Sequence, residues 1–244
     1  MDGQILNTLN IVSAGAARAV VEKLVGILQQ EDAGLVVHAR YGAVQDMKAC
    51  VMVQEAVDVV VLTDRLLHEL ADNSLVVAGS CHDLGAVGTG IAVRADTAPP
   101  DVSSPQRLRD VLLACGSVFV PNPATASAGK VFLQALDELG IQAQVLSRLI
   151  PCSSGHDAMA QLARSAGPTH IGVMQITEIL ASSDVRLAGP LPGALQRHTV
   201  YSAAVATHAN SPDRALAFIQ RLVSQKYELR AAGFGQAQVP TGAS

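Results

Sequence analysis

The stretch LNIVSAGAARAVVEKLVGILQQ, residues 9–30, decides the fold. Its first five residues form a short, apolar and β-branched run that stops at Ala14 and Gly15, as is typical of a buried strand ending in a turn. From residue 16 onward apolar side chains recur at helical spacing, and they are Ala19, Val20, Leu24, Ile27 and Leu28. The stretch therefore predicts a buried strand followed by an amphipathic helix.

The same alternation continues along the first third of the chain. Strands are expected at residues 34–41, 57–62, 75–78 and 88–94, and helices at residues 43–53 and 63–70. The polar residues 79–85 are expected to join the last two of these strands. Strands and helices that alternate at such short spacing predict a parallel sheet with crossover helices.

A second series of strands and helices follows the loop at residues 95–104. Strands are expected at residues 117–121, 142–146, 170–174 and 199–207, and helices after Ser104 and at residues 129–139, 156–164, 176–180 and 212–223. Ser104 and Pro105 have the residue types preferred at the N-cap and first position of a helix. Two series of similar size predict two Rossmann-like α/β lobes with mixed, mostly parallel sheets and a ligand cleft between them.

The composition excludes several classes of protein. Apolar residues make up 49% of the 244 residues and charged residues 16%, which is typical of a globular protein with a large interior. No apolar run reaches the roughly 20 residues that span a bilayer. A net charge of −4 and 3% aromatic residues disfavour nucleic-acid binding. The start MDGQ lacks the features of a signal peptide, so we expect a cytoplasmic protein if Met1 is the natural start and a periplasmic one if a leader was removed.

Neither a metal nor a cofactor is expected. The widely spaced cysteines, Cys50, Cys81, Cys115 and Cys152, form no CxxC motif, which argues against zinc and favours free thiols. The glycine-rich residues 85–90 (GAVGTG) run between two expected strands, whereas a dinucleotide fingerprint runs from a strand into a helix. The histidines form no HExxH pair, and GxSxG is absent, so few catalytic motifs are present.

Three loops share one design, in which small residues lead into a helix: residues 13–16 (SAGA), 41–43 (YGA) and 126–129 (ASAG). Small residues leave the first N–H groups of a helix uncovered, and these groups together with the helix dipole favour an anion. The alternative is that strand-to-helix turns simply use small residues. The ligand contacts expected in these loops are Ser13, Ala14, Gly15, Ala16, Gly42, Ser127, Ala128 and Gly129.

Further candidates for ligand contact lie at strand ends and in the polar stretch 79–85. Arg40 ends an expected strand, where ligands of parallel sheets bind, although a solvated surface arginine is an equal alternative. Gln175 directly follows the strand HIGVM and can point its amide into the cleft. Tyr201 begins the strand that returns to the first lobe, and a core tyrosine is its alternative. Ser80, in the polar stretch, is the last residue expected to contact the ligand.

Five motifs in their order along the chain resemble those of a known family: LNIVSAGAARAV, VDVVVLT, PNPATASAGKVF, IGVMQITEIL and LAGPLPGALQRHTVYSAAV. They resemble the type II solute-binding proteins of ABC transporters, in the molybdate-binding-like branch, over residues 9–233. The resemblance implies two chain crossovers and an anion held at helix starts without a metal. It also implies a first lobe of residues 1–82 plus 199–244 and a second lobe of residues 83–198.

One departure from the branch affects the ligand. Gly42 and Ala43 stand where the molybdate binders have a serine. With fewer hydroxyl donors, the ligand can be a carboxylate as well as an oxyanion. The QITEI and GPLP segments are also similar to the bacterial aconitate isomerase group, for which His82 and His156 are candidate acid–base residues. We therefore expect a monomeric protein that binds a small anion, either as the substrate-binding protein of an ABC-type transporter, with its membrane component as partner, or as a related sensor. The alternative is a cofactor-free isomerase of a small unsaturated polycarboxylate.

Overall fold

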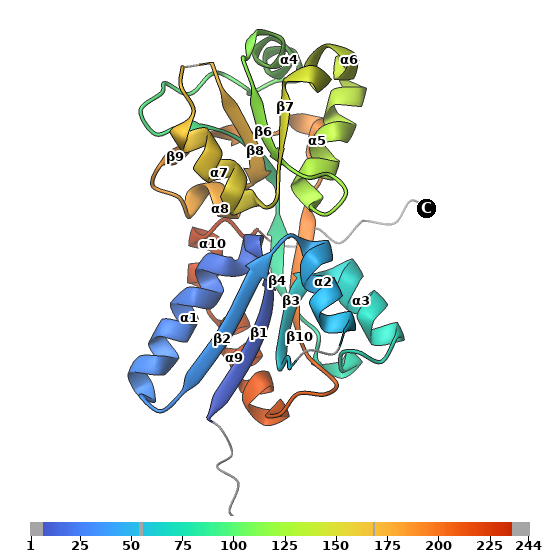
Figure 1. Ribbon diagram of the computed structural model, residues 1–244, viewed down its shortest axis with the longest axis vertical. Helices are drawn as coiled ribbons and strands as arrows, with labels where there is room; N and C mark the ends of the chain where they lie inside the picture. Colours follow the sequence, from blue (N-terminus) through green and yellow to red (C-terminus); the bar gives the residue numbers. More distant parts are fainter. Residues whose placement is uncertain (1–6, 54–55, 168, 236–244) are drawn as a thin grey trace, which may run out of the picture.

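Strand β1 (Thr8–Ala14) lies in the first of two sheets in the computed structural model, which describes residues 7–53, 56–167 and 169–235. The first sheet has the strand order β2-β1-β3-β10-β4, and the second has the order β7-β6-β8-β5-β9. Each sheet forms the centre of one lobe, and the two lobes meet at a narrow waist (Figure 1). The predicted fold of two α/β lobes is confirmed.

The first lobe surrounds its sheet with helices on both faces. Its strands are β1, β2 (Val36–Gly42), β3 (Val59–Thr63), β4 (His82–Val87) and β10 (Thr199–Val205). Its helices are η1 (Gly15–Ala17), α1 (Arg18–Glu31), α2 (Val44–Met52), α3 (Asp64–Asp72), η2 (Ala78–Ser80), α9 (Pro212–Ser224) and α10 (Lys226–Ala231). Strand β10 runs antiparallel to β3 and β4, whereas β1 pairs in parallel with β2 and β3.

The second lobe repeats this plan. Its strands are β5 (Thr89–Arg94), β6 (Val118–Pro121), β7 (Leu149–Cys152), β8 (Ile171–Gln175) and β9 (Val185–Pro190). Its helices are α4 (Pro105–Ala114), α5 (Ser127–Glu138), α6 (Gln142–Val145), η3 (Leu146–Arg148), α7 (Gly155–Arg164), α8 (Ile176–Leu180) and η4 (Gly193–Leu195). Strand β5 runs antiparallel to β8 and β9, so both sheets are mixed and mostly parallel.

The chain crosses between the lobes twice, as predicted. It passes from β4 to β5 through Gly88, and it returns from β9 to β10 through residues 191–198. The predicted division at residue 82 assigns most of β4 to the second lobe, whereas the pairing of β4 with β10 places this strand in the first sheet.

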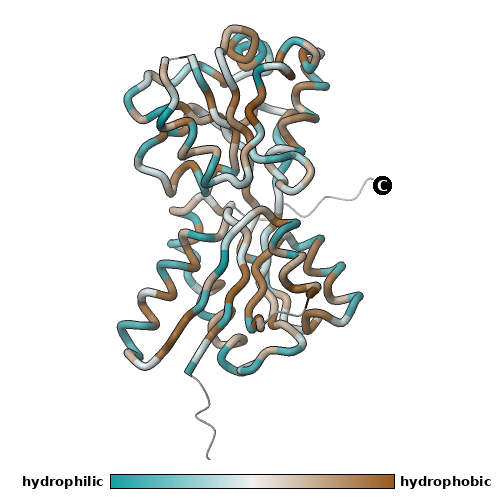
Figure 2. Tube along the Cα trace, viewed as in Figure 1, coloured by the Kyte–Doolittle hydropathy of each residue, from teal (hydrophilic) through white to brown (hydrophobic). Residues whose placement is uncertain are grey.

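Each lobe has its own apolar core. All residues of β3 (VVVLT) are buried, as expected for a central strand covered on both faces. Figure 2 shows apolar residues concentrated along the central strands of both lobes. In the first lobe this core includes Leu24 and Ile219 from helices α1 and α9, and in the second lobe it includes Phe132 from α5. Separate cores allow each lobe to keep its shape while the space between them changes.

Three of the predicted segments differ in the structure. Residues 142–146 are helical, because Ile141 and Val145 lie four residues apart and bury the same helix face; the expected strand occurs later, as β7. Residues 75–78 make only an isolated bridge, between Val76 and Ala206. The polar stretch 79–85 contains the start of strand β4, where the Ser202 hydroxyl donates a hydrogen bond of 2.7 Å to Asp83.

The small residues of PNPATASAGKVF have one clear packing role. A methyl group at Gly129, in the first turn of α5, would overlap the carbonyl oxygen of Pro121 and lie 3.0 Å from the nitrogen of Pro123. These obstacles are backbone atoms, so they cannot rotate away. Helix α5 therefore begins directly against the loop that leads into it, and only glycine permits this approach.

Replacing Gly129 with alanine is expected to lower the free energy of unfolding by about 2 kcal/mol, because the added methyl group must displace backbone. Gly26 provides a matched control, since it lies inside helix α1 with no atom within 4 Å of its would-be Cβ. Gly26→Ala is expected to stabilise the chain by up to about 1 kcal/mol. Urea unfolding measures both variants, and a stabilising effect of Gly129→Ala would contradict the close approach.

Candidate functional site

A small cavity lies where the two lobes meet, and we call it the closed cavity. It has a volume of about 20 Å³, which is room for about one water molecule. Its lining residues come from both lobes: Ala14, Gly15, Ala16, Gly42, Ala43, Val44, Pro121, Ala126, Ser127, Ala128, Gly155, Gln175, Glu178 and Tyr201. Most of these residues have no polar side chain, so the polar groups of this wall are largely backbone.

The backbone of the closed cavity comes from four helix starts. Gly15 begins η1, Val44 begins α2, Ser127 begins α5 and Gly155 begins α7. No side-chain cap covers the starts of η1, α2 and α5 in the described structure, whereas Ser154 caps α7 by accepting a hydrogen bond of 3.1 Å from the N–H of Asp157. Uncapped helix starts present partial positive charge. Two lobes thus direct helix starts at one small space.

The two lobes touch beside the closed cavity. The N–H of Gln45, in the first turn of α2, donates a hydrogen bond of 3.2 Å to the carbonyl oxygen of Thr125 in the opposite lobe. This contact joins the first lobe to the loop that precedes α5. The structure is therefore that of lobes in contact, with the closed cavity between them.

A larger space opens outward from the closed cavity, and we call it the outer cleft. Its volume is about 470 Å³. Its lining residues are Gly15, Arg18, Ala19, Glu22, Tyr41, Gly42, Ser154, His156, Met159, Ala160, Thr177, Glu178, Ala181, Ser182, Ser183 and Asp184. Gly15, Gly42 and Glu178 line both spaces. The two spaces are thus adjacent and share part of one wall.

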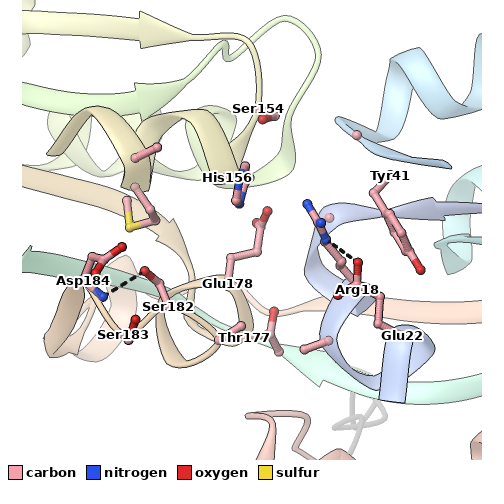
Figure 3. A pocket seen from close by; sticks show the side chains of 16 residues that line it. Arg18, Glu22, Tyr41, Ser154, His156, Thr177, Glu178, Ser182, Ser183 and Asp184 are labelled. Carbon is pink, nitrogen blue, oxygen red and sulfur yellow. Dashed lines mark hydrogen bonds and ion pairs between the residues drawn. The ribbon is translucent and has the colours of Figure 1, made fainter. Parts of the chain in front are cut away.

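The outer cleft has more acidic than basic side chains, since Glu22, Glu178 and Asp184 line it together with Arg18. Arg18 donates a hydrogen bond of 2.8 Å to Glu22, and its guanidinium lies 5.1 Å from the ring centroid of Tyr41. Burial raises the pKa of Tyr41 to about 12, with the Glu22 charge adding to the rise and Arg18 opposing it. Figure 3 shows the side chain of Glu178 directed into the space between His156 and Arg18. The outer cleft is polar without being strongly basic.

Glu178, on helix α8, is the carboxyl group between the lobes. A Cβ atom built on Gly15 would lie 2.5 Å from its Oε1, and one built on Gly155 would overlap the same oxygen. The carboxyl group therefore lies against the helix starts of both lobes, where the two glycines leave room for it. Within the described chain it has no hydrogen-bond partner, and burial raises its pKa to about 7.

Two polar side chains complete the wall of the closed cavity. Gln175, at the end of β8, donates a hydrogen bond of 3.2 Å from its amide nitrogen to the hydroxyl oxygen of Tyr201. Burial raises the pKa of Tyr201; the charge of Glu178 adds to the rise, and hydrogen bonds with Ser127 and Gln175 oppose it. The amide oxygen of Gln175 is buried and has no partner among the described residues. A buried acceptor of this kind points to a polar ligand group.

Most of the residues expected from the sequence to contact ligand lie around the closed cavity. They are Ala14, Gly15, Ala16, Gly42, Ser127, Ala128, Gln175 and Tyr201. The other four, Ser13, Arg40, Ser80 and Gly129, line neither of the two spaces. The structure thus brings the three small-residue loops together, as the shared design predicts, but not every residue in them.

The four outlying residues have contacts of their own. The Ser13 hydroxyl is fully buried and donates a hydrogen bond of 3.1 Å to the carbonyl oxygen of Ala14. Arg40 is exposed on β2, with a nitrogen 3.9 Å from the sulfur of Cys50. Ser80 donates to the Val77 carbonyl and accepts from the N–H of Val205, which holds η2 against β10. Gly129 permits the close approach described above.

The proposed acid–base histidines lie in different places. His156 lines the outer cleft, whereas His82 belongs to strand β4 and lines neither space. Glu178 and Gly155 were not among the expected site residues. The signal for Glu178 was its place three residues after Gln175, in a short helix that follows a strand end. This signal is weak, because a single glutamate in an apolar helix such as ITEIL usually marks the exposed face of the helix.

The structure contains few features of a metal site or of a membrane span. In residues 7–53, 56–167 and 169–235, no three histidine, cysteine, aspartate or glutamate side chains are grouped so that they could hold a metal ion. Over the same residues, no helix has both the length and the apolar character needed to cross a bilayer. The four cysteines are free thiols, with Cys115 and Cys152 buried.

The chain belongs to the bacterial extracellular solute-binding proteins, because the model of this family matches residues 9–234. A curated relative, the aconitate isomerase of a Pseudomonas species, is 26% identical over 171 residues. This match spans 70% of the chain and 63% of the relative, so the chain covers less than two thirds of that protein's length.

Solved structures share the fold. The periplasmic molybdate-binding protein of Azotobacter vinelandii superposes with a TM-score of 0.78 at 20% identity, over 94% of this chain and 100% of that one. A sulfate-binding protein of Mycobacterium tuberculosis superposes with a TM-score of 0.69 at 16% identity, over 95% of this chain and 87% of that one. These similarities establish the two-lobe solute-binding fold that the sequence motifs predict.

Proposed function

We propose that this chain binds a small anion in the closed cavity, as the solute-binding component of an ABC-type transporter or of a related sensor. The observation that carries the proposal is the convergence of uncapped helix starts from both lobes, Gly15 and Val44 from one and Ser127 from the other, on a single space. Backbone N–H groups at helix starts bind anions without any cation. Ser127, Gln175 and Tyr201 add polar side chains to the same wall.

The sizes of the two spaces favour a carboxylate over a tetrahedral oxyanion. About 20 Å³ is too little for a tetrahedral anion unless the lobes separate or Glu178 turns away. A single carboxylate group needs less rearrangement, and the rest of an organic acid then extends into the outer cleft of about 470 Å³. Because two of the structural neighbours are named as molybdate-binding and sulfate-binding proteins, the test also includes oxyanions.

The family supports a transport setting. Extracellular solute-binding proteins deliver solute to a membrane component, so we propose a monomer that works in the periplasm with an ABC membrane component. The Gln45–Thr125 contact between lobes is the closed arrangement that such a component would recognise. The residues proposed to hold the anion are those of the closed cavity.

A thermal-shift panel of molybdate, tungstate, sulfate, citrate, cis-aconitate and trans-aconitate tests the proposal. At least one of these anions is expected to raise the midpoint, because a ligand at 100 times its Kd stabilises the folded state by about 2.7 kcal/mol. Tyr201→Phe removes a hydroxyl group from the closed cavity and is expected to weaken binding about tenfold. Tyr227→Phe is the matched control, since Tyr227 is 80% exposed and lines neither space.

Two results would contradict this proposal. One is the absence of any stabilisation by the whole panel between about pH 6 and 8, at concentrations well above a typical solute affinity. The other is stabilisation that Tyr201→Phe and Tyr227→Phe leave equally unchanged, since the anion would then bind elsewhere on the chain.

A second candidate function is the isomerisation of a small unsaturated polycarboxylate. The observation that favours it is Glu178, whose pKa of about 7 suits a general base beside a bound carboxylate. Its carboxylate would remove an allylic proton from the substrate and return that proton to the other end of the allyl system as the double bond shifts. No oxidant or cofactor is needed, because the proton removed is the proton returned. Conversion of cis- to trans-aconitate, followed by NMR and lost in Glu178→Gln, tests this function.

A further inference from the structure

The closed cavity contains one ionisable carboxyl group and no basic side chain among its lining residues within the described chain. Glu178 is that carboxyl group, and the other side chains that line the cavity are apolar or neutral and polar. An anion that enters this space meets partial positive charge from helix starts and, if Glu178 is ionised, a full negative charge. Two like charges a few ångströms apart in the partly buried space between the lobes repel each other.

Glu178 lies in the wall that the closed cavity shares with the outer cleft. Its Oε1 lies against the α-carbons of Gly15 and Gly155, so the carboxyl group is held between the uncapped start of η1, which the anion would use, and the start of α7. Both glycines line the closed cavity together with Glu178. The ligand and this carboxyl group therefore occupy the same small space, and we expect them to be in contact when the ligand is bound.

The charged groups around Glu178 do not neutralise it. Arg18 and Glu22 of α1 form an ion pair of 2.8 Å with each other, and His156 of α7 and Asp184 line the outer cleft. Tyr41 of β2 and Tyr201 of β10 carry raised pKa values, so both are neutral phenols near neutral pH.

The neighbouring strands supply no closer cation. Arg94 of β5 and Arg186 of β9 lie toward the end of the second sheet that is opposite to the Thr89–Gln175 pair. Gln175 lines the same cavity with a neutral amide, so this wall adds no positive charge that could offset an ionised Glu178. A protonated carboxyl group is the one donor that a glutamate can supply.

We propose that Glu178 determines the specificity of the site by entering the complex as a neutral carboxylic acid, so that above neutral pH the chain takes up about one proton with each anion it binds. This inference rests on the proposed anion-binding function. The acid hydrogen donates a hydrogen bond to an oxygen of the anion, which turns a repulsive contact into an attractive one. The site then selects an anion that offers an unprotonated acceptor oxygen next to Glu178.

Proton uptake makes the affinity depend on pH. Without ligand Glu178 has a pKa of about 7, so at lower pH the proton is already present and binding costs nothing extra. Above this pKa the proton must be taken from solution, and the affinity is expected to fall about tenfold for each pH unit. By the same linkage, the bound anion raises the pKa of Glu178 further.

Sulfate, molybdate and trans-aconitate serve as probes, in thermal-shift and calorimetric titrations between about pH 6 and 9. Wild-type affinity is expected to fall about 50-fold from pH 7 to pH 9, and calorimetry in two buffers of different ionisation enthalpy should show about one proton taken up per anion at pH 8. Glu178→Gln keeps a donor in place and removes the titration, so its affinity should be independent of pH and exceed that of the wild type at pH 9.

Glu22→Gln is the matched control, because Glu22 lines the outer cleft and not the closed cavity. This variant should keep the wild-type pH dependence. Binding with the same affinity at all pH values, or a pH dependence that survives in Glu178→Gln, would overturn the inference while leaving anion binding intact. No stabilisation by any probe at any pH would instead overturn the proposed function. Turnover of aconitate without proton uptake would assign Glu178 to the isomerase, because a base must be ionised when its substrate is bound.

Discussion

Asp58→Ala is expected to lower the free energy of unfolding by about 4 kcal/mol, the largest effect of any substitution considered for this chain. The carboxyl group of Asp58 is fully buried just before β3. One oxygen accepts hydrogen bonds of 2.7 and 3.0 Å from the backbone and side-chain nitrogens of Asn10, and the other accepts bonds of 2.7 and 3.3 Å from the N–H groups of Asn210 and Ser211. This group ties β1 to the start of α9, so its removal leaves several buried donors without partners.

Urea unfolding at pH 7 measures the effect. Asp72→Ala is the control, because Asp72 is an exposed aspartate at the end of α3, and a change within about 0.5 kcal/mol is expected there. A loss below about 1 kcal/mol for Asp58→Ala would show that water replaces the carboxylate as acceptor, and that the four hydrogen bonds contribute little to stability.

The sequence predicts the parts of the fold in which local pattern and burial agree. Strand β3 is apolar on both faces because helices cover both, and its five residues read unambiguously as a buried strand. The sequence predicts a strand where the structure has helix α6, because four residues are too few to distinguish the helical from the strand period. Strand β4 was missed because its first residues, His82 and Asp83, are polar; pairing with β10 and the bond from Ser202 stabilise it instead.

The sequence likewise predicts one part of the candidate site and not the rest. The helix starts at Gly15 and Ser127 were predicted, because small residues between a strand and a helix are visible in sequence. Gly129 shows the limit of that signal, since a glycine needed for close backbone packing looks the same as one that contacts a ligand. Glu178 could not be found in this way, because its role depends on Gly15 and Gly155, which lie far away in sequence and come together only in the fold.

Glu178→Gln is expected to stabilise the ligand-free chain at pH 8 by about 3 kcal/mol and to have little effect near pH 4.5. In the folded chain burial raises the pKa of Glu178 from 4.5 to about 7, so the folded state binds its proton more tightly than the unfolded state. The stability linked to this proton is fully present below about pH 4.5 and is lost as the pH rises through about 7. Glutamine has nearly the same shape and no charge to desolvate, so the Glu178→Gln variant does not lose this stability as the pH rises.

The measurement is urea unfolding of both proteins between about pH 4.5 and 8.5, in a buffer free of polycarboxylates and oxyanions. Glu22→Gln is again the control, and it should follow the wild-type curve, since Glu22 is paired with Arg18 in the outer cleft. If wild type and Glu178→Gln were equally stable at pH 8, the carboxylate would be well solvated, and the repulsion on which the coupling of proton and anion depends would be absent. Asp58 and Glu178 thus represent opposite cases of a carboxyl group inside one fold. Four donors make Asp58 a tie between β1 and the start of α9, and the lack of donors leaves Glu178 ready to receive a proton.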